Sequence, residues 1–280
     1  MKRIFAILLA LALALSLMAC GTSGGSTNTN TNTSTGAEGT AAQTASLLAT
    51  TVEAPDLTDA TVILLGGDTV QITGSGVAEE NGTVTITAGG VYVIKGTLDD
   101  GRVVVNAPGE EVTLALENAD LTCSDSSPLY IYKASSVLLW LPEGSASTLT
   151  DGGSYVFDDD WSSAEEDEPN ACLYSKADLI IAGGGGLTVN GNYNNGVTSK
   201  DTLVIDGVTL TVSAANNGIT GKDSCTVQGG AVTVTSAGKG LKSDGELLLE
   251  SGTFAMDCED DAFHSNGDVT VTGGSYTVAT

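Results

Sequence analysis

Residues 201–222 read DTLVIDGVTLTVSAANNGITGK, and residues 223–244 read DSCTVQGGAVTVTSAGKGLKSD. A third unit, GELLLESGTFAMDCEDDAFHSN, covers residues 245–266, and a fourth begins at Gly267. The unit starts are 22 residues apart. A short period of this kind indicates a solenoid, in which each repeat packs only on its neighbours.

The pattern inside each unit is that of β-strands. Apolar and polar residues alternate, Val, Ile and Thr dominate, and Gly marks the bends, whereas no helical stripe is present. At about 3.3 Å per residue, one unit makes a loop of roughly 60–70 Å, enough for three short strands. We therefore predict an all-β fold, a right-handed parallel β-helix with 22-residue coils.

Stacked coils place equivalent residues in columns about 4.8 Å apart. The predicted inward columns are Leu203–Cys225–Leu247–Val269, Ile205–Val227–Leu249–Val271, Leu210–Val232–Phe254–Tyr276, Val212–Val234–Met256–Val278 and Val197–Ile219–Leu241–Phe263. Cys225 falls in an inward column, so we interpret it as a small core residue. The spacing of the other cysteines leaves their pairing open.

Looser versions of the pattern extend back towards residue 60. Leu179 and Ile181 precede Leu203 and Ile205 by 24 residues, and further apolar pairs follow upstream. Residues 142–170 interrupt the pattern, and we expect them to form a long loop that leaves the coil. The β-helix domain is assigned to residues 60–280, with a C-terminus that we expect to be truncated because the sequence stops within its last coil.

The first 59 residues carry a different kind of sequence. Lys2 and Arg3 precede an apolar run that ends in LMAC at Cys20, a pattern typical of a lipoprotein signal peptide over residues 1–19. We expect lipidation of Cys20 and anchoring to the outer face of a bacterial cell membrane; the alternative is an ordinary signal peptide with an unrelated Cys. Residues 20–59 are rich in Thr, Asn, Gly and Ser, typical of a flexible linker.

The charge of the chain limits its partners. Ten Lys and Arg stand against 35 Asp and Glu, a formal net charge of −25. Nucleic-acid binding needs a basic face, so that function is excluded. An exported acidic protein instead suggests bound calcium.

Two groups of acids are the candidate calcium ligands. Carboxylates stacked on neighbouring coils repel each other unless a cation lies between them. Calcium takes six to eight oxygen ligands, and Asp and Glu supply them. The alternative is that lysines pair with these acids along the columns while Asn side chains cap the turns. The candidates are Asp257, Glu259, Asp260 and Asp261 in one group and Asp201, Asp223 and Asp244 in the other.

Aromatic residues supply the candidate sugar contacts. Strand alternation places Tyr130, Tyr132 and Trp140 on the outside of the coil, and Tyr155 and Trp161 lie in the expected loop. Exposed aromatic rings suit stacking on sugar rings; the alternative is that the loop folds back and buries Trp140.

Lys176, Lys200 and Lys222 recur at the turn that enters successive units, and Asn195, Asn217 and Lys239 share another column. We add Lys200 and Lys222 as cationic sugar contacts.

No residue is assigned a catalytic role. The chain has one histidine, His264, which argues against a Ser-His-Asp triad. The glycines from Gly183 to Gly186 are interpreted as a turn between strands, because no helix follows them as a dinucleotide-binding loop requires.

Residues 170–212 read NACLYSKADLIIAGGGGLTVNGNYNNGVTSKDTLVIDGVTLTV, with NNGITGKDS at 216–224 and LTDGGSYVF at 149–157. This combination resembles a family of exported bacterial carbohydrate-binding domains. The resemblance implies a parallel β-helix similar to pectate lyases, bound calcium, and binding of plant cell-wall polysaccharides such as cellulose and pectin. It also implies calcium at Asp201, Asp223 and Asp244. The sequence departs from the family pattern at Lys239, where an acid is expected.

Together these observations predict a cell-surface lipoprotein that binds cellulose or pectin through a calcium-stabilised β-helix and contacts the membrane only by its lipid. Two alternatives stay open: a calcium-dependent pectate lyase, and a structural or adhesive stalk without a sugar ligand.

Overall fold

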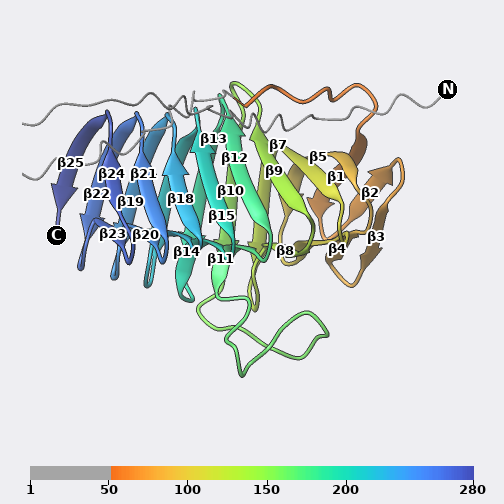
Figure 1. Cartoon of the computed structure of the whole chain (residues 1–280). Helices are drawn as coiled ribbons and strands as arrows, with labels where there is room; N and C mark the ends of the chain where they lie inside the picture. Colours follow the sequence, from red (N-terminus) through yellow and green to blue (C-terminus); the bar gives the residue numbers. More distant parts are fainter. Residues whose placement is uncertain (1–51) are drawn as a thin grey trace, which may run out of the picture. The chain divides into compact units, whose positions relative to one another are not determined.

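The computed structural model describes residues 52–280. The predicted signal peptide, Cys20 and most of the predicted linker therefore lie outside the described residues. All regular structure within residues 52–280 is strand, and the strands wind as a parallel β-helix (Figure 1). No helix in this part of the chain has the length and apolarity that a membrane span requires.

From β8 onward, each coil contributes one strand to each of three walls. β7 (Glu111–Cys123) is long enough to begin two walls, because its first half pairs with β9 and its second half with β10. The first wall continues as β9 (Ser136–Leu141), β12 (Asp178–Gly183), β15 (Thr202–Asp206), β18 (Ser224–Val227), β21 (Glu246–Leu249) and β24 (Val269–Val271). The second wall continues as β10 (Ala146–Asp151), β13 (Gly186–Gly191), β16 (Thr209–Ala214), β19 (Ala231–Ser236), β22 (Thr253–Cys258) and β25 (Ser275–Ala279).

The third wall is a separate nine-stranded sheet. It consists of β3 (Val77–Glu80), β4 (Thr83–Ile86), β6 (Arg102–Asn106), β8 (Leu129–Lys133), β11 (Ala171–Ser175), β14 (Asn195–Ser199), β17 (Ile219–Gly221), β20 (Leu241–Ser243) and β23 (Phe263–Ser265). At the N-terminal end, β1 (Thr61–Gly67) pairs with β2 (Val70–Thr73) and with β5 (Gly90–Leu98).

The predicted columns are confirmed by the strand register. Leu203 pairs with Cys225, Cys225 with Leu247, and Leu247 with Val269, and the other four columns align in the same way. Most of these side chains are fully buried, so they form one continuous core. In the last coil Val269, Val271 and Val278 stay about half exposed, because no other described coil packs on them.

Part of the expected loop at residues 142–170 is a strand. β10 pairs with β7 and β13, so the loop that leaves the coil covers only residues 152–170. The inward positions of β10 are Ser147, Leu149 and Asp151, and all three are buried. Two of the three are polar, so the apolar alternation that identifies a strand was missing from the sequence. Ser147 Oγ compensates by accepting a hydrogen bond from the Ala119 amide at 3.0 Å.

The turn predicted at Gly183 to Gly186 is confirmed, because β12 ends at Gly183 and β13 begins at Gly186. Gly183 has a φ of 120°, and a Cβ atom there would lie 2.2 Å from the Leu141 carbonyl oxygen of the preceding coil. Only glycine fits this position. The turn therefore lets the backbones of two coils stack closely.

The described cysteines are buried in the coil and are free thiols: Cys123, Cys172, Cys225 and Cys258. Cys225 is fully buried, which confirms its interpretation as a core residue. Burial raises the pKa of its thiol to about 12, so it stays protonated as a small apolar side chain.

Candidate functional site

The loop at residues 152–170 is fastened to the third wall. Figure 1 shows it as the long green segment that leaves the coil between β10 and β11. The Asp159 carboxylate pairs with the Arg102 guanidinium on β6, and the Trp161 carbonyl accepts a hydrogen bond from the Tyr130 hydroxyl on β8 at 2.7 Å. Near its end the loop places Glu168 beside lysines that follow β11 and β14.

An aromatic cluster lies beneath this loop. Tyr130 and Tyr174 meet edge to face with ring centroids 5.6 Å apart, and both are fully buried. The alternation of β8 turns Tyr130 outward, and we expected it to be exposed like Tyr132. That expectation is wrong, because Tyr130 packs with Tyr174, Val104 and the partly buried Trp161. Trp140 lies in the first wall and is half-buried.

Three of the four predicted sugar-binding aromatic rings already contact protein groups. Lys133 Nζ lies 4.6 Å and Lys176 Nζ 5.5 Å from the centroid of the Tyr132 ring. The Arg102 guanidinium lies 5.4 Å from the centroid of the Trp161 ring.

The Tyr155 ring stacks on Tyr193 at 4.1 Å, and its hydroxyl donates to Asp151 at 2.7 Å. Trp140 makes no aromatic or cation contact of this kind with the described residues. The assignment of these four residues to sugar binding stays a prediction.

The predicted lysine contacts lie in one column directly after the strands of the third wall. The Lys176 amide donates a hydrogen bond to the Ile131 carbonyl of the preceding coil at 2.8 Å. On the next two coils, the Lys200 amide donates to the Ser175 carbonyl at 2.8 Å and the Lys222 amide donates to the Ser199 carbonyl at 2.9 Å. We call Lys176, Lys200 and Lys222 the lysine column; Tyr132 precedes it and Asp244 follows it. Lys222 is exposed and forms no ion pair with the described residues.

Glu168 neutralises the other two members of the lysine column. One carboxylate oxygen lies 2.6 Å from Lys176 Nζ, and the other pairs with Lys200 Nζ. Burial acts to raise the pKa of Glu168, but the contacts with the two lysines and with the nearby Tyr174 hydroxyl outweigh it and lower the pKa to about 2. Glu168 is therefore ionised at neutral pH. No local sequence pattern indicates this contact, because Glu168 and Lys200 are 32 residues apart.

A polar cavity of about 220 Å³ lies between the loop and the early coils. The guanidinium of Arg102 lies at its wall, held by Asp159 and by the Ser126 hydroxyl at 3.1 Å. No sequence pattern marks this site, because its residues come from several distant segments. The lining is Asn81, Thr83, Asp100, Gly101, Arg102, Cys123, Asp125, Ser126, Val156, Asp158 and Asp159.

The predicted calcium ligands Asp201, Asp223 and Asp244 occupy two columns. The Asp223 amide bonds to the Asp201 carbonyl at 3.2 Å, whereas the Asp244 amide bonds to the Lys222 carbonyl at 3.0 Å. Burial raises the pKa of Asp201, and the nearby carboxylates of Asp178 and Asp223 raise it further. Asp178, which was not among the predicted ligands, therefore belongs to this acidic group.

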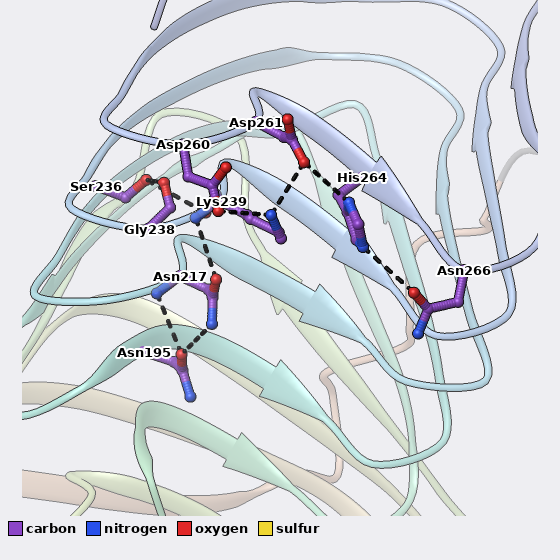
Figure 2. Close-up of polar contacts among 9 residues, drawn as sticks. All are labelled: Asn195, Asn217, Ser236, Gly238, Lys239, Asp260, Asp261, His264 and Asn266. Atoms are coloured by element: carbon purple, nitrogen blue, oxygen red, sulfur yellow. Dashed lines mark hydrogen bonds and ion pairs between the residues drawn. The ribbon is translucent and has the colours of Figure 1, made fainter.

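The second acidic group lies at the end of a polar ladder, which Figure 2 shows. Asn195 Oδ1 accepts a hydrogen bond from Asn217 Nδ2 at 3.0 Å, and Asn217 Oδ1 accepts one from the Lys239 amide at 3.1 Å. Lys239 Nζ then lies 2.6 Å from Asp260 and 3.0 Å from Asp261. These contacts raise the pKa of Lys239 and lower the pKa of both aspartates.

Lys239 therefore supplies a cation to two of the predicted metal ligands, as the alternative of Lys–Asp pairing anticipated. Asp257 and Glu259 are exposed near them and form no ion pair with described residues. Within residues 52–280, no group of three or more His, Cys, Asp or Glu side chains is arranged to hold a metal ion. Calcium at either acidic group stays a prediction.

Comparison with known proteins agrees with this architecture. The model of the family described as carbohydrate-binding domain-containing protein matches residues 80–280. The chain belongs to this family. The part of this chain that the family model matches includes the lysine column, the loop at residues 152–170 and the polar ladder of Figure 2.

Two relatives extend the comparison. A carbohydrate-binding domain-containing protein of Acetivibrio thermocellus is 40% identical over 132 residues, which are 47% of this chain and 45% of the relative. The match thus spans less than half the length of that relative. A solved structure of a polysaccharide lyase-like protein from C. thermocellum, a gadolinium derivative, is similar with a TM-score of 0.70 and 29% identity. That similarity covers 78% of this chain and all of the solved chain.

Proposed function

We propose that this protein binds an extracellular polysaccharide of the plant cell-wall type, cellulose or pectin, along its third wall. The observation that carries the proposal is the lysine column beside Tyr132, which gathers cations on one face of a strongly acidic chain. A surface that repeats with every coil, about 4.8 Å apart, suits a polymer that repeats along its length. Membership of a carbohydrate-binding domain family supports the same function.

Binding to insoluble polymer tests this proposal. Purified protein is mixed with cellulose or calcium-free pectin gel, and the bound fraction is measured after sedimentation. Retention on at least one polymer is expected. Lys222→Gln removes an exposed cation of the third wall and is expected to lower retention on pectin, whereas Lys95→Gln removes the contact with Glu117 between β5 and β7 and serves as the matched control. Absence of retention on both polymers would favour a structural stalk instead.

Calcium binding near Asp201 is part of the proposal. The support is electrostatic: burial raises the pKa of Asp201, and the nearby carboxylates of Asp178 and Asp223 raise it further. A divalent cation among them would remove this repulsion. Calcium would then stabilise the coils that also present Lys200 and Lys222.

Export and lipidation are the remaining part of the proposal. The support is the sequence of residues 1–20, with its basic start, apolar run and Cys20. Mass spectrometry of the N-terminal peptide from membrane-bound protein is expected to find lipid on Cys20. Cys20→Ala should release the protein from the membrane fraction, and unchanged membrane attachment would contradict the assignment.

A calcium-dependent polysaccharide lyase is the second candidate function. The similarity to a polysaccharide lyase-like protein favours it. Incubation with polygalacturonate and calcium distinguishes the two, because a lyase produces unsaturated chain ends that absorb in the near ultraviolet. Sustained production of such ends would replace the binding proposal by the enzymatic one.

A further inference from the structure

Glu168 occupies a carboxylate-binding position on the third wall. Its side chain is 6% exposed, and the ammonium groups of Lys176 and Lys200 reach its two oxygens from successive coils. The lysines belong to the rigid coil, whereas Glu168 belongs to the loop at residues 152–170. The position is therefore built by the coil and filled by the loop.

This position has more hydrogen-bonding capacity than Glu168 uses. Thr198 Oγ1 is buried and has no hydrogen-bond partner among the described residues. The buried Tyr174 hydroxyl lies near enough to Glu168 to help lower the pKa of that carboxyl, yet it forms no hydrogen bond of ordinary geometry with a described residue. Tyr174 and Thr198 pair across β11 and β14, and each lies two positions before a lysine of the pair. A buried hydroxyl without a partner is unfavourable, which points to a ligand with further oxygen atoms.

We propose that Lys176, Lys200, Tyr174 and Thr198 form a subsite for the carboxylate and hydroxyl groups of an acidic, uronate-containing polysaccharide, and that Glu168 occupies this subsite in its absence. The inference rests on the proposed function and names its substrate class. Two adjacent ammonium groups match a carboxylate rather than a neutral sugar. Lys222, exposed on the next coil, extends the same column for a neighbouring uronate.

The loop must move for such a polymer to enter. Its outward side carries Glu165, Glu166 and Asp160, which are exposed and form no ion pair with described residues. These charges repel a polyanion while the loop is seated. Glu168 thus acts as an internal competitor, and the observed affinity is lowered by the fraction of molecules in which the subsite is open.

Glu168→Gln tests this inference, with Glu165→Gln as a control that removes the same charge from the same loop. Affinities for an oligogalacturonide and for a cello-oligosaccharide of equal length are measured by calorimetry at low salt with chelator present. We expect Glu168→Gln to bind the oligogalacturonide about tenfold tighter than the unmodified protein, since the competitor is gone. Glu165→Gln should change binding less than about twofold. Adding Lys176→Gln and Lys200→Gln to Glu168→Gln should abolish the gain.

Unchanged or weaker oligogalacturonide binding by Glu168→Gln, with unfolding like that of the unmodified protein, would overturn the inference. If Glu168→Gln does not fold, Trp161 emission is followed in a Trp140→Phe background as each sugar is added. A change with the oligogalacturonide alone supports loop displacement, and no change during binding contradicts it. Binding of the cello-oligosaccharide alone would leave the proposed function standing and refute this inference, whereas binding of neither sugar would count against both.

Discussion

The Tyr130 hydroxyl donates a hydrogen bond to the Trp161 carbonyl at 2.7 Å, and this contact ties the loop at residues 152–170 to the middle of the third wall. Tyr130 is fully buried and is rigidly held by β8, whereas Trp161 lies on a segment outside the coil. The contact therefore forms only when the loop lies against the third wall, and its loss should leave the core of the coil intact.

Tyr130→Phe is expected to loosen the loop while leaving the coil intact. A neutral hydrogen bond of this kind contributes about 0.5–1.5 kcal/mol, too little for its loss to unfold the coil. Trp161 emission in a Trp140→Phe background should shift towards the red as the indole gains contact with water. Tyr92→Phe removes a comparable bond to the Ala88 carbonyl and should leave that emission unchanged. An unshifted emission in Tyr130→Phe would show that the contact does not hold the loop.

The seating of the loop should depend on acid pH through Glu168. Its pKa falls from the ordinary value of 4.5 to about 2 in the folded protein, because the contacts with the two lysines and with the Tyr174 hydroxyl outweigh burial. A carboxyl group whose pKa is lowered on folding stabilises the folded state at pH values above its ordinary pKa. This stabilisation is lost as the pH falls towards the pKa that the group has in the folded protein. Between about pH 4.5 and 2, the free energy of unfolding should decline in denaturant titrations. Glu168→Gln should remove part of this decline, and identical slopes in both proteins would contradict the assignment.

Leu203→Ala should destabilise the whole coil. Leu203 is fully buried between Leu179 and Cys225, which pair with it on the neighbouring coils. Removing a buried Leu side chain to Ala costs about 2–5 kcal/mol, and urea denaturation measures the loss. Val204→Ala, on the outward side of the same strand, should cost less than about 1 kcal/mol. Equal losses at the two positions would argue against the inward column.

Lys239→Asn should convert an internal ion pair into a calcium-responsive position. The substitution extends the Asn195–Asn217 ladder by one residue and leaves Asp260 and Asp261 without their cation. We expect a lower melting temperature in chelator and a recovery when calcium is added. Lys242→Asn, which removes a longer contact of 3.4 Å to Asp244, is the control and should gain no calcium response. A melting temperature independent of calcium in Lys239→Asn would refute this prediction.

Asp201→Asn should stabilise the protein when calcium is absent. The pKa of Asp201 is raised in the folded state by burial and by Asp178 and Asp223. A carboxyl group whose pKa is raised on folding destabilises the folded state when it ionises. The protein is therefore most stable at low pH, where Asp201 is protonated, and it loses stability as the pH rises through the pKa of Asp201 in the folded protein. At neutral pH in chelator, Asp201→Asn should therefore melt higher than the unmodified protein. Calcium should raise the melting temperature of the unmodified protein more than that of the variant; equal shifts would exclude Asp201 as a ligand.

The repeating part of the coil could be predicted from sequence because its inward positions are apolar on every coil. Leu203, Cys225 and Leu247 share one position at a constant separation of 22 residues, so their alignment followed from the period alone. β10 was missed because Ser147 and Asp151 occupy inward positions, and a buried polar residue looks like an exposed one in a hydrophobicity pattern. Its burial depends on hydrogen bonds to other coils, which no local pattern records.

The residues of the candidate site that recur in columns could be predicted from the sequence, whereas the contacts made by the loop could not. The lysine column followed from the repeat, and so did the position of Lys239 in the Asn ladder. The burial of Tyr130 and the pairing of Glu168 with Lys200 depend on where an irregular segment settles. Such a segment has no sequence period. The sequence therefore indicated that a loop is present, but it did not indicate which residues of the coil the loop contacts.

The constant register of the 22-residue coils makes the length of the molecule adjustable in whole steps. Excising residues 223–244 would bring two equivalent edges together, since Leu203 and Leu247 occupy the same column. Each such step changes the length by about 4.8 Å. Under the proposed function, an insertion or deletion of one unit would change how many sugar residues the third wall can span, while the remaining coils keep their side chains.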